Sequence, residues 1–403
     1  WRESELETLA RGWYEREIAV PESWRGRAVV VDVGRVSTDA VIFVDNLECG
    51  RVAWPGGAVN VTPALNFDSA RDGVVRARLR VLVVAALEET EALAFMGVGE
   101  GQVTLTRAKL ESRGLIGDVV LKSRPKGAHI SDVFVQPSTR NHELRVDVEL
   151  RGVRQAGTVA VTVQALNESG RVEKGFTPST VTVTAAEVQI VTLRWPWDSA
   201  RLWDVRQPNL YTLRVSAEGP GLEDVCAQAF GFREFWVEGR RFMLNGTEIR
   251  LRPNLFPDSW HNGHMRETID GALDGLMWEG NNILELWPWN HDERGTVLTR
   301  ELTVARADTK GMLIIGAALD FKPYVVNSSW QPIWNDPGVK TRYEERMSTE
   351  LRRYRNHPSV VMWATSANFF GHVQDQNPQV IGRRGWVPAA DTRWHERAAD
   401  ARE

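Results

Sequence analysis

One run, NHPSVVMWATSAN at residues 356–368, constrains the fold of this chain more than any other stretch. Pro358 cannot continue a helix, and it biases His357 toward an extended backbone. Residues 360–363 form a short apolar run, which is typical of a strand buried on both faces of a parallel sheet. The Arg-rich turn at residues 352–355 suits the end of a helix, where cations meet the negative end of the helix dipole. The run therefore predicts a helix, a sharp stop and a buried strand.

The same alternation of helices and strands extends back to the Asn245-Gly246 pair, which predicts a tight hairpin turn. Parallel βα units are the expected outcome, and they match the first half of a (β/α)8 barrel. A whole barrel takes about 250 residues, so four strands make only half of one. The predicted strands are residues 249–252, 282–287, 312–319 and 360–363, and the predicted helices are residues 266–279, 301–310 and 343–354.

The chain before residue 236 has a different pattern, with short alternating strands separated by Gly and Pro. This pattern indicates β-sandwiches rather than helices. We expect a jelly-roll-like sandwich at residues 1–124 and an immunoglobulin-like sandwich at residues 125–235, with the partial barrel at residues 236–403. The predicted fold class is therefore multidomain β followed by α/β.

Composition excludes several classes of function. The net charge of −4 over 403 residues argues against a nucleic-acid or anionic-membrane partner. No apolar stretch is long enough to cross a membrane. Cys49 and Cys226 make neither a disulfide framework nor a metal cluster. The glycines at residues 97–101 lack the strand and helix that a nucleotide site requires, so we predict no cofactor.

Three stretches resemble glycoside hydrolase family 2, which includes β-galactosidases, β-glucuronidases and β-mannosidases. They are the GFRE run at residues 231–234, the FMLNG run at residues 242–246 and the NHPSVVMW run at residues 356–363. The first sandwich also resembles the sugar-binding domain that opens this family. The resemblance covers nearly the whole chain and implies the N-terminal part of such an enzyme, with a truncated barrel.

In that family a glutamate after the NHPSVV run is the general acid/base, and its position here is Asn368, or Phe369 if the loop has slipped by one residue. Neither side chain exchanges a proton at neutral pH. The family's nucleophile follows a seventh strand, which the four predicted strands do not include. Two other carboxylates could face the pocket: Glu285 lies within the second predicted strand, and Asp320 ends the third. Glu285 is either functional or paired with a barrel arginine such as Arg252, because a charge in a buried strand needs a partner or a role.

The resemblance also implies sugar-contacting residues in the loops that follow the first, second and fourth strands. Stacking on tryptophan suits the apolar face of a pyranose ring, although core packing is the competing explanation. Two histidines after the first strand, His261 and His264, lack a third ligand, so we predict polar loop residues there and no metal site. The predicted sugar-binding residues are Trp287, Trp289, Asn290, Asn254 and Phe369.

Three functional hypotheses follow. The first is a fragment of a family 2 enzyme that hydrolyses β-linked glycosides, with a carbohydrate partner and with a C-terminal segment or a second copy completing the barrel. The second is a carbohydrate-binding pseudo-enzyme, which Asn368 favours. The third is a lyase on the same scaffold. The chain begins at Trp1 without a signal peptide, so the compartment stays open, with a slight preference for the periplasm or the exterior.

Overall fold

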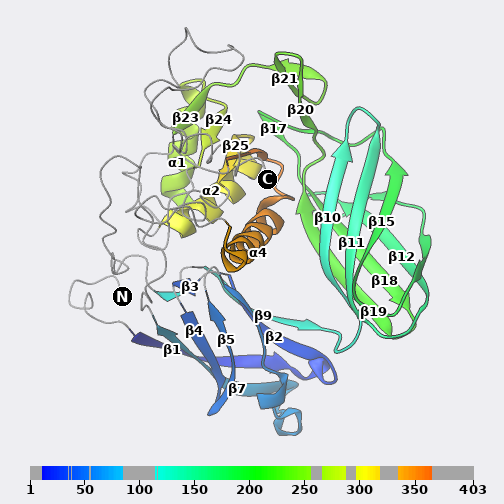
Figure 1. Ribbon diagram of the computed structural model, residues 1–403, viewed down its shortest axis with the longest axis vertical. Coiled ribbons are helices and arrows are strands. Elements are labelled where there is room, and N and C mark those ends of the chain that lie inside the picture. The colour runs from blue at the N-terminus through cyan, green and yellow to red at the C-terminus, as the bar shows by residue number, and fades with distance from the viewer. Residues whose placement is uncertain are drawn as a thin grey trace.

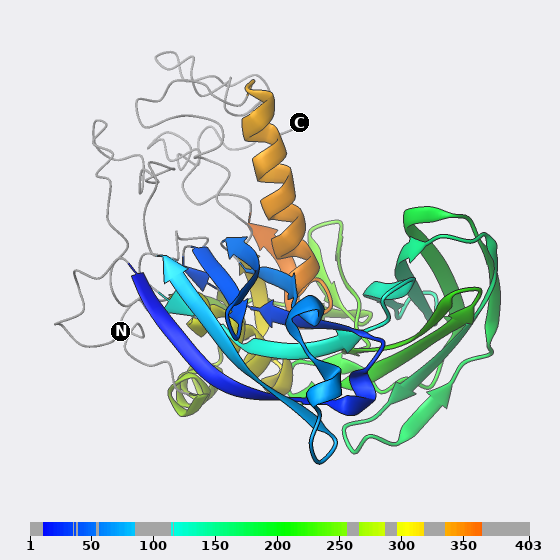
Figure 2. The same cartoon turned by 90° about the horizontal axis from the view of Figure 1, so that it is seen from below.

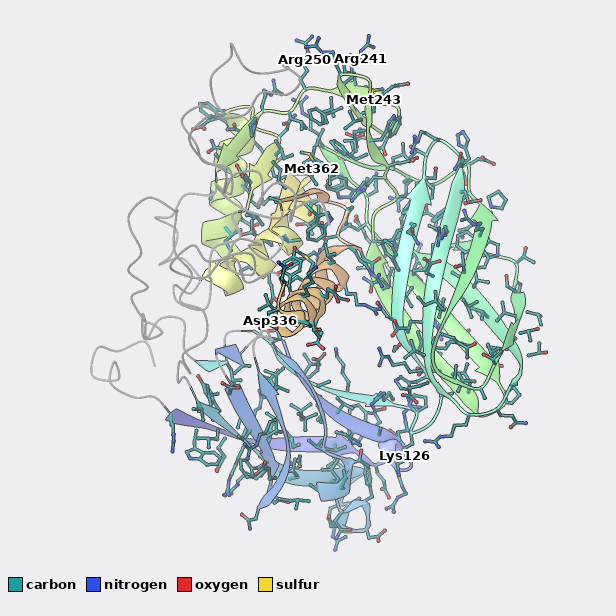
Figure 3. All side chains as sticks on the ribbon, viewed as in Figure 1. Lys126, Arg241, Met243, Arg250, Asp336 and Met362 are labelled. Carbon is teal, nitrogen blue, oxygen red and sulfur yellow. The ribbon has the colours of Figure 1, made fainter. Side chains whose placement is uncertain are left out.

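The computed structural model describes residues 11–34, 36–37, 39–53, 56–84, 114–115, 117–255, 266–286, 296–317 and 335–364. Two β-sandwiches, a three-stranded hairpin sheet and a parallel α/β layer follow one another along the chain (Figure 1). Figure 3 labels Lys126 at the connection between the two sandwiches, and Arg241 and Arg250 at the hairpin sheet. None of the described helices is long and apolar enough to cross a membrane.

The first sandwich packs two antiparallel sheets around a core that is rich in valine. One sheet has the order β1-β7-β4-β5, and the other has the order β6-β2-β9. Alternation along each strand sends one set of side chains inward, as in β7, where Val75, Ala77 and Leu79 are buried between exposed arginines. Its strands are β1 (Arg11–Pro21), β2 (Ala28–Val33), β3 (Val36–Ser37), β4 (Asp39–Val44), β5 (Leu47–Ala53), β6 (Gly57–Asn60), β7 (Val74–Val84), β8 (Gly114–Leu115) and β9 (Val119–Arg124).

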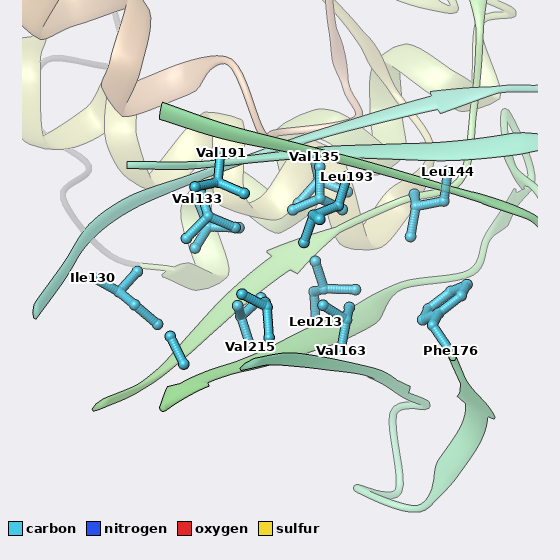
Figure 4. Packing of buried hydrophobic residues seen from close by; sticks show 14 of the residues in the cluster. Ile130, Val133, Val135, Leu144, Val163, Phe176, Val191, Leu193, Leu213 and Val215 are labelled. Carbon is cyan, nitrogen blue, oxygen red and sulfur yellow. The ribbon is translucent and has the colours of Figure 1, made fainter. Parts of the chain in front are cut away.

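The second sandwich has a sheet of order β10-β11-β15 facing one of order β13-β12-β18-β19, with β14 also paired to β12. Residues from both inner faces, such as Val133, Leu193, Val163 and Leu213, interdigitate in one core (Figure 4). Its strands are β10 (His129–Ser138), β11 (Glu143–Val153), β12 (Gly157–Leu166), β13 (Val172–Gly175), β14 (Ser179–Val183), β15 (Ala186–Pro196), β18 (Tyr211–Gly219) and β19 (Leu222–Phe230), with the small ribbon β16 (Trp203–Asp204) and β17 (Gln207–Pro208) between β15 and β18.

A hairpin sheet connects this sandwich to the α/β layer. It consists of β20 (Phe235–Glu238), β21 (Arg241–Leu244) and β22 (Thr247–Ile249). The predicted Asn245-Gly246 turn lies between β21 and β22, and both residues have positive φ, 52° and 87°. Those angles are what a type I′ hairpin turn requires.

The α/β layer is a parallel sheet of order β23-β24-β25-β26, which confirms the predicted strand–helix alternation. One face packs on the helices through Ile269 and Leu273 of α1 and Leu284 of β24. The other face packs through Ile283 and Leu313 against Trp203 from the second sandwich. The elements are β23 (Pro253–Leu255), α1 (Arg266–Trp278), β24 (Ile283–Glu285), α2 (Thr296–Lys310), β25 (Leu313–Ala317), α4 (Pro337–Tyr354) and β26 (Val360–Ala364).

One predicted strand was wrong in position. Of the strand expected at residues 249–252, Ile249 instead ends β22 and residues 250–252 form no strand, and the first parallel strand is Pro253–Leu255. The Asn282 side chain accounts for the difference, because its Nδ2 donates to Arg250 O at 2.9 Å and its Oδ1 accepts from Arg252 N at 2.7 Å. The Asn282 side chain thus takes the backbone hydrogen bonds that residues 250 and 252 would otherwise make with a neighbouring strand.

Candidate active site

The carboxyl ends of the four parallel strands meet at one edge of the sheet. The register pairs Leu255 with Glu285, Glu285 with Ile315, and Ile315 with Met362. Loops that leave this edge carry the chemistry in barrels of alternating strands and helices. The candidate active site therefore lies over the ends of β23, β24, β25 and β26.

Glu285 is the last residue of β24 and is half-buried. It lies two residues after Ile283, so alternation places it on the sheet face away from the helices, the face that Ile283 and Leu313 share. Among the described residues no ion pair joins it to Arg252, whose side chain is exposed. The alternative of a structural pair with Arg252 is therefore not supported, and a role for Glu285 in the site stays a prediction.

Asn254 occupies the middle of β23, where the register pairs it with Leu284. Leu284 is fully buried in the cluster that faces the helices. Paired residues of parallel strands share a face, so Asn254 stands on the opposite face from Glu285. The two predicted residues thus belong to neighbouring strand ends but to different sides of the sheet.

The other predicted site residues lie outside the described ranges. Asp320 comes three positions after the end of β25, and Asn368 comes four positions after the end of β26. Trp287, Trp289, Asn290 and Phe369 are also outside these ranges, as are His261 and His264. Within the described residues, no group of three or more His, Cys, Asp and Glu side chains could hold a metal ion.

The segment that leads into β26 is held by a buried acid. Asp308, at the end of α2, binds His357 Nδ1 through Oδ2 at 2.5 Å and accepts from Ser359 N through Oδ1 at 3.0 Å. Its backbone oxygen accepts from the Trp203 indole at 2.8 Å. Burial of the imidazole opposes protonation, but the hydrogen bond and charge of Asp308, with the charge of Glu301, raise the pKa of His357. The pair therefore carries opposite charges over a wider pH range than an isolated histidine allows.

The GFRE run fits against the same segment from the second sandwich. A Cβ at Gly231 would lie 2.7 Å from both Pro358 and Trp203, so only glycine allows this approach. Arg233 donates from Nε to Pro358 O at 2.8 Å and from Nη2 to Val360 O at 2.5 Å. Burial lowers the pKa of Arg233 to about 10, against the charges of Asp308 and Glu234, and leaves it protonated at neutral pH.

Asn356 completes this connection. Its Oδ1 accepts from Val135 N at 2.9 Å, and its Nδ2 donates to Val133 O at 2.8 Å. The side-chain amide thus hydrogen-bonds the backbone of β10 as a neighbouring strand would, although Asn356 lies 221 residues further along the chain than Val135. The NHPSVV run is therefore a structural junction that fixes where β26 begins.

Two arginines of the turn at the end of α4, Arg352 and Arg355, contact the second sandwich. Arg352 binds Asp132 at 2.9 Å and Glu149 at 2.8 Å, while Arg355 also pairs with Asp132. Burial alone would raise the pKa of Glu149, but hydrogen bonds from Ser131, Arg352 and Arg151 lower it to about 2. Glu149 therefore stays ionised at neutral pH and keeps its bond to α4.

Arg353 has a different set of partners. It donates to Gly34 O of the first sandwich at 2.8 Å and pairs with Glu301 of α2. Figure 1 shows α4 between the two sandwiches, where these contacts converge. The helix-dipole explanation for the arginines was incomplete, because their partners come from three other parts of the chain.

Comparison with known proteins agrees with this architecture. The profile described as "Glycosyl hydrolases family 2" matches residues 128–233, and that of "Glycosyl hydrolases family 2, TIM barrel domain" matches residues 292–377. A β-glucuronidase from Paenibacillus borealis is 24% identical over 90% of this chain, and a β-galactosidase from Clostridium acetobutylicum is 24% identical over 62%. A family 2 member from Bacteroides cellulosilyticus superposes with a TM-score of 0.62 over 89% of this chain and 45% of its own, at 18% identity.

The fold and the junction define a scaffold of β-sandwiches joined to a parallel α/β layer. The chain belongs to glycoside hydrolase family 2. The chain spans 59% of the length of the Paenibacillus borealis relative and 28% of that from Clostridium acetobutylicum.

Proposed function

We propose that the chain forms the N-terminal portion of a glycosidase that cleaves β-linked glycosides, and that its sugar pocket lies over the ends of β23, β24, β25 and β26. The observation that carries this proposal is the parallel sheet itself. The barrel profile of the family begins at residue 292, runs through β25 and β26, and extends past position 368 to residue 377. The relatives named a β-glucuronidase and a β-galactosidase support a substrate that is a β-glycoside.

The chemistry needs an acid and a nucleophile, which in retaining glycosidases are two carboxyl groups about 5 to 5.5 Å apart. Asn368 occupies the position of the family's acid. An amide there can hydrogen-bond a sugar hydroxyl but cannot protonate a leaving group. We propose that Glu285 or Asp320 supplies the proton, and that residues further along the gene product supply the second carboxylate.

We keep the three-part division at residues 1–124, 125–235 and 236–403 as part of this proposal. The separate sheets of the two sandwiches and of the parallel layer support it. A completing C-terminal segment is the partner this proposal requires, and a second copy of the chain is the alternative. We also propose that Trp287, Trp289, Asn290 and Phe369 contact the sugar, whereas Asn254, on the face of the sheet that packs on the helices, does not.

The test is hydrolysis of 4-nitrophenyl β-glycosides, including the glucuronide and the galactoside, by the full-length gene product. We expect turnover, and we expect Glu285→Gln or Asp320→Asn to lower kcat by about a hundredfold or more, the usual contribution of a general acid. Glu279→Gln is the matched control, because Glu279 is exposed and lies between α1 and β24, before the opposite end of the strand that Glu285 ends. Turnover that survives both acid-site substitutions would refute the assigned roles.

The competing function is a carbohydrate-binding pseudo-enzyme, which the amide at position 368 favours. It predicts saturable sugar binding by calorimetry with no turnover on any substrate of the panel. Asn368→Glu separates the two further. A gain of turnover in that variant means that the rest of the machinery is present and that only the acid was lost.

A further inference from the structure

One strand of the second sandwich lies at the edge of its sheet. The sheet order β10-β11-β15 leaves β15 paired with β11 alone among the strands that the structure describes. Figure 1 shows β15 on the side of β11 away from β10, and Figure 2 shows the same sandwich to one side of α4. The edge of a sheet presents a row of N–H and C=O groups that can pair with a strand of another chain. What pairs with β15 is therefore a question about the partners of this protein.

The opposite edge of the same sheet is closed by a side chain. Asn356 binds Val135 N and Val133 O of β10, so these backbone groups point away from β11. Backbone groups alternate in direction along antiparallel strands, and the register carries this alternation across β11 to β15. Alternate residues of β15 therefore direct their N–H and C=O groups away from β11, and they include Val188, Ile190 and Thr192.

The middle of β15 lacks the features that keep edge strands apart. Residues 188–193, VQIVTL, contain no charge, no Gly and no Pro, whereas Lys, Pro or a bulge commonly blocks such an edge. The register between β11 and β15 runs without a shift from Glu143 to Arg151. Within the described part of the chain, the backbone groups at this edge have no backbone partner outside the sheet. The edge is therefore regular and uncharged over six residues.

The side chains at the same positions form an apolar ridge on the outer face of the sheet. Val188 is 44% exposed, and Ile190 is 61% exposed. The charged side chains beside the ridge are already paired within the chain, at 2.6 Å in Arg194–Glu143 and at 2.9 Å in Arg151–Glu149. A strand that joins this edge therefore meets apolar side chains and leaves no charge without its partner.

We propose that β15 pairs with β15 of a second copy of this chain, antiparallel and about a two-fold axis at Ile190. The two sheets then form one continuous sheet of order β10-β11-β15-β15-β11-β10. In this register Ile190 lies opposite its own counterpart, and Val188 lies opposite Thr192 of the second copy. Glu187 and Arg194 each lie opposite an uncharged residue, so no like charges meet across the axis.

A second copy suits this edge because the strand is complementary to itself. Any other strand would need the same uncharged pattern, which the chain supplies twice in a two-fold pair. The pairing consumes the edge in both copies, so it closes at two subunits and does not extend into a fibre. The interface involves only the second sandwich. The proposal is therefore independent of how the barrel is completed and of the proposed glycosidase activity.

Sedimentation velocity of the full-length gene product over a wide range of concentration tests the proposal. We expect a dimer. Ile190→Lys places two ammonium groups opposite each other at the axis and should weaken self-association about tenfold or more, whereas Ile190→Val should retain it. Val225→Lys is the matched control and should leave the dimer unchanged, because Val225 is 54% exposed on β19 of the other sheet. An unchanged melting temperature of Ile190→Lys shows that this variant is folded.

Two further measurements test the register. Ile190→Cys should form an intermolecular disulfide on mild oxidation, because Cα atoms of opposed residues in an antiparallel pair lie about 5.5 Å apart, within reach of a disulfide. Val225→Cys should form none. Amide hydrogen exchange at residues 188–192 should be slow in the dimer and fast in Ile190→Lys.

Four results would overturn the proposal. The first is a monomer at every concentration, and the second is a series of larger species that grows with concentration. The third is a dimer that Ile190→Lys leaves intact, which assigns the contact to another surface such as the partial barrel. The fourth is a monomer in which residues 188–192 exchange slowly, which means that another segment of the same polypeptide pairs with the edge.

Discussion

The two sandwiches differ in how they are joined to the barrel strands. The second sandwich contributes Arg233 and the backbone of β10 to the junction around Pro358 and Asn356, and its Glu149 pairs with α4. The contact described between the first sandwich and α4 is a single hydrogen bond from Arg353 to Gly34 O. Both sandwiches have their own buried cores, so the difference lies in their interfaces rather than in their interiors.

This difference separates two roles. The second sandwich shares buried polar groups and a hydrophobic cluster with the parallel sheet, since Trp203 packs with Ile283 and Leu313. Groups of this kind lose their partners if either side unfolds, so the second sandwich and the parallel sheet should unfold together. Among the described residues, the first sandwich contacts the rest of the chain through the Arg353–Gly34 bond, the Arg27–Asp224 pair and the Arg124–His129 contact, so we expect it to behave as a module. Four substitutions test this contrast.

Trp203→Ala should have the largest effect. The side chain is fully buried, and its indole donates to Asp308 O at 2.8 Å. Removing it leaves a cavity between the second sandwich and the sheet, and we expect a loss of about 3–5 kcal/mol in the free energy of unfolding. Urea denaturation measures this loss. Trp278→Ala removes an 89% exposed ring and should stay within about 0.5 kcal/mol. Similar losses in the two variants would contradict a shared core.

Asn356→Ala should come next. The substitution leaves Val133 O and Val135 N without the amide that pairs them, and both lie in buried surroundings. Each of the two unsatisfied groups costs at least about 1 kcal/mol, so we expect a loss of at least about 2 kcal/mol in the same measurement. Asn141→Ala, at an exposed turn of the same sandwich, is the control. Asn356→Asp tests the geometry further, because a carboxylate accepts from Val135 N but cannot donate to Val133 O.

The His357–Asp308 pair predicts a dependence on pH. Because the pKa of His357 is raised in the folded state, the charged pair stabilises the fold at pH values below the ordinary histidine pKa. This stability is lost as the pH rises through the raised value. We expect the free energy of unfolding to fall across that interval. Asp308→Asn should make the free energy of unfolding nearly independent of pH between about pH 5 and 9. Urea denaturation at each pH measures this dependence. A profile that keeps its slope in this variant would assign the titration to another group.

How far the sequence predicts these features depends on the range of the interactions involved. The Asn245-Gly246 turn and the strand at residues 360–363 follow from local rules, since a type I′ turn and an apolar run need only their neighbours, although only Val360 of that strand is buried. The junction does not. Nothing near Asn356 in the sequence indicates that its amide would pair with β10, and the arginines of residues 352–355 fit a helix end equally well.

The candidate site shows the same limit. The apolar run predicted a strand at residues 282–287 with Glu285 inside it, whereas the structure ends β24 at Glu285. Its supposed pairing with Arg252 rested on charge alone, and the structure directs Arg252 to solvent and its backbone to Asn282. The buried Asp308 was missed because a lone acid in a polar helix gives no local signal. Its partners, at His357 and Ser359, lie about fifty residues further along.

Arg353→Ala should have the smallest effect, and it tests the modular role of the first sandwich. The guanidinium is only partly buried, so losing its bond to Gly34 O and its pair with Glu301 should cost about 0.5–1 kcal/mol. The loss should appear as a lower melting temperature for the second sandwich and the parallel sheet, with the melting of the first sandwich unchanged. Differential scanning calorimetry, with Trp203→Ala to mark the larger unit, distinguishes the two transitions. A single transition that shifts as a whole in both variants would show that the first sandwich is as firmly joined as the second.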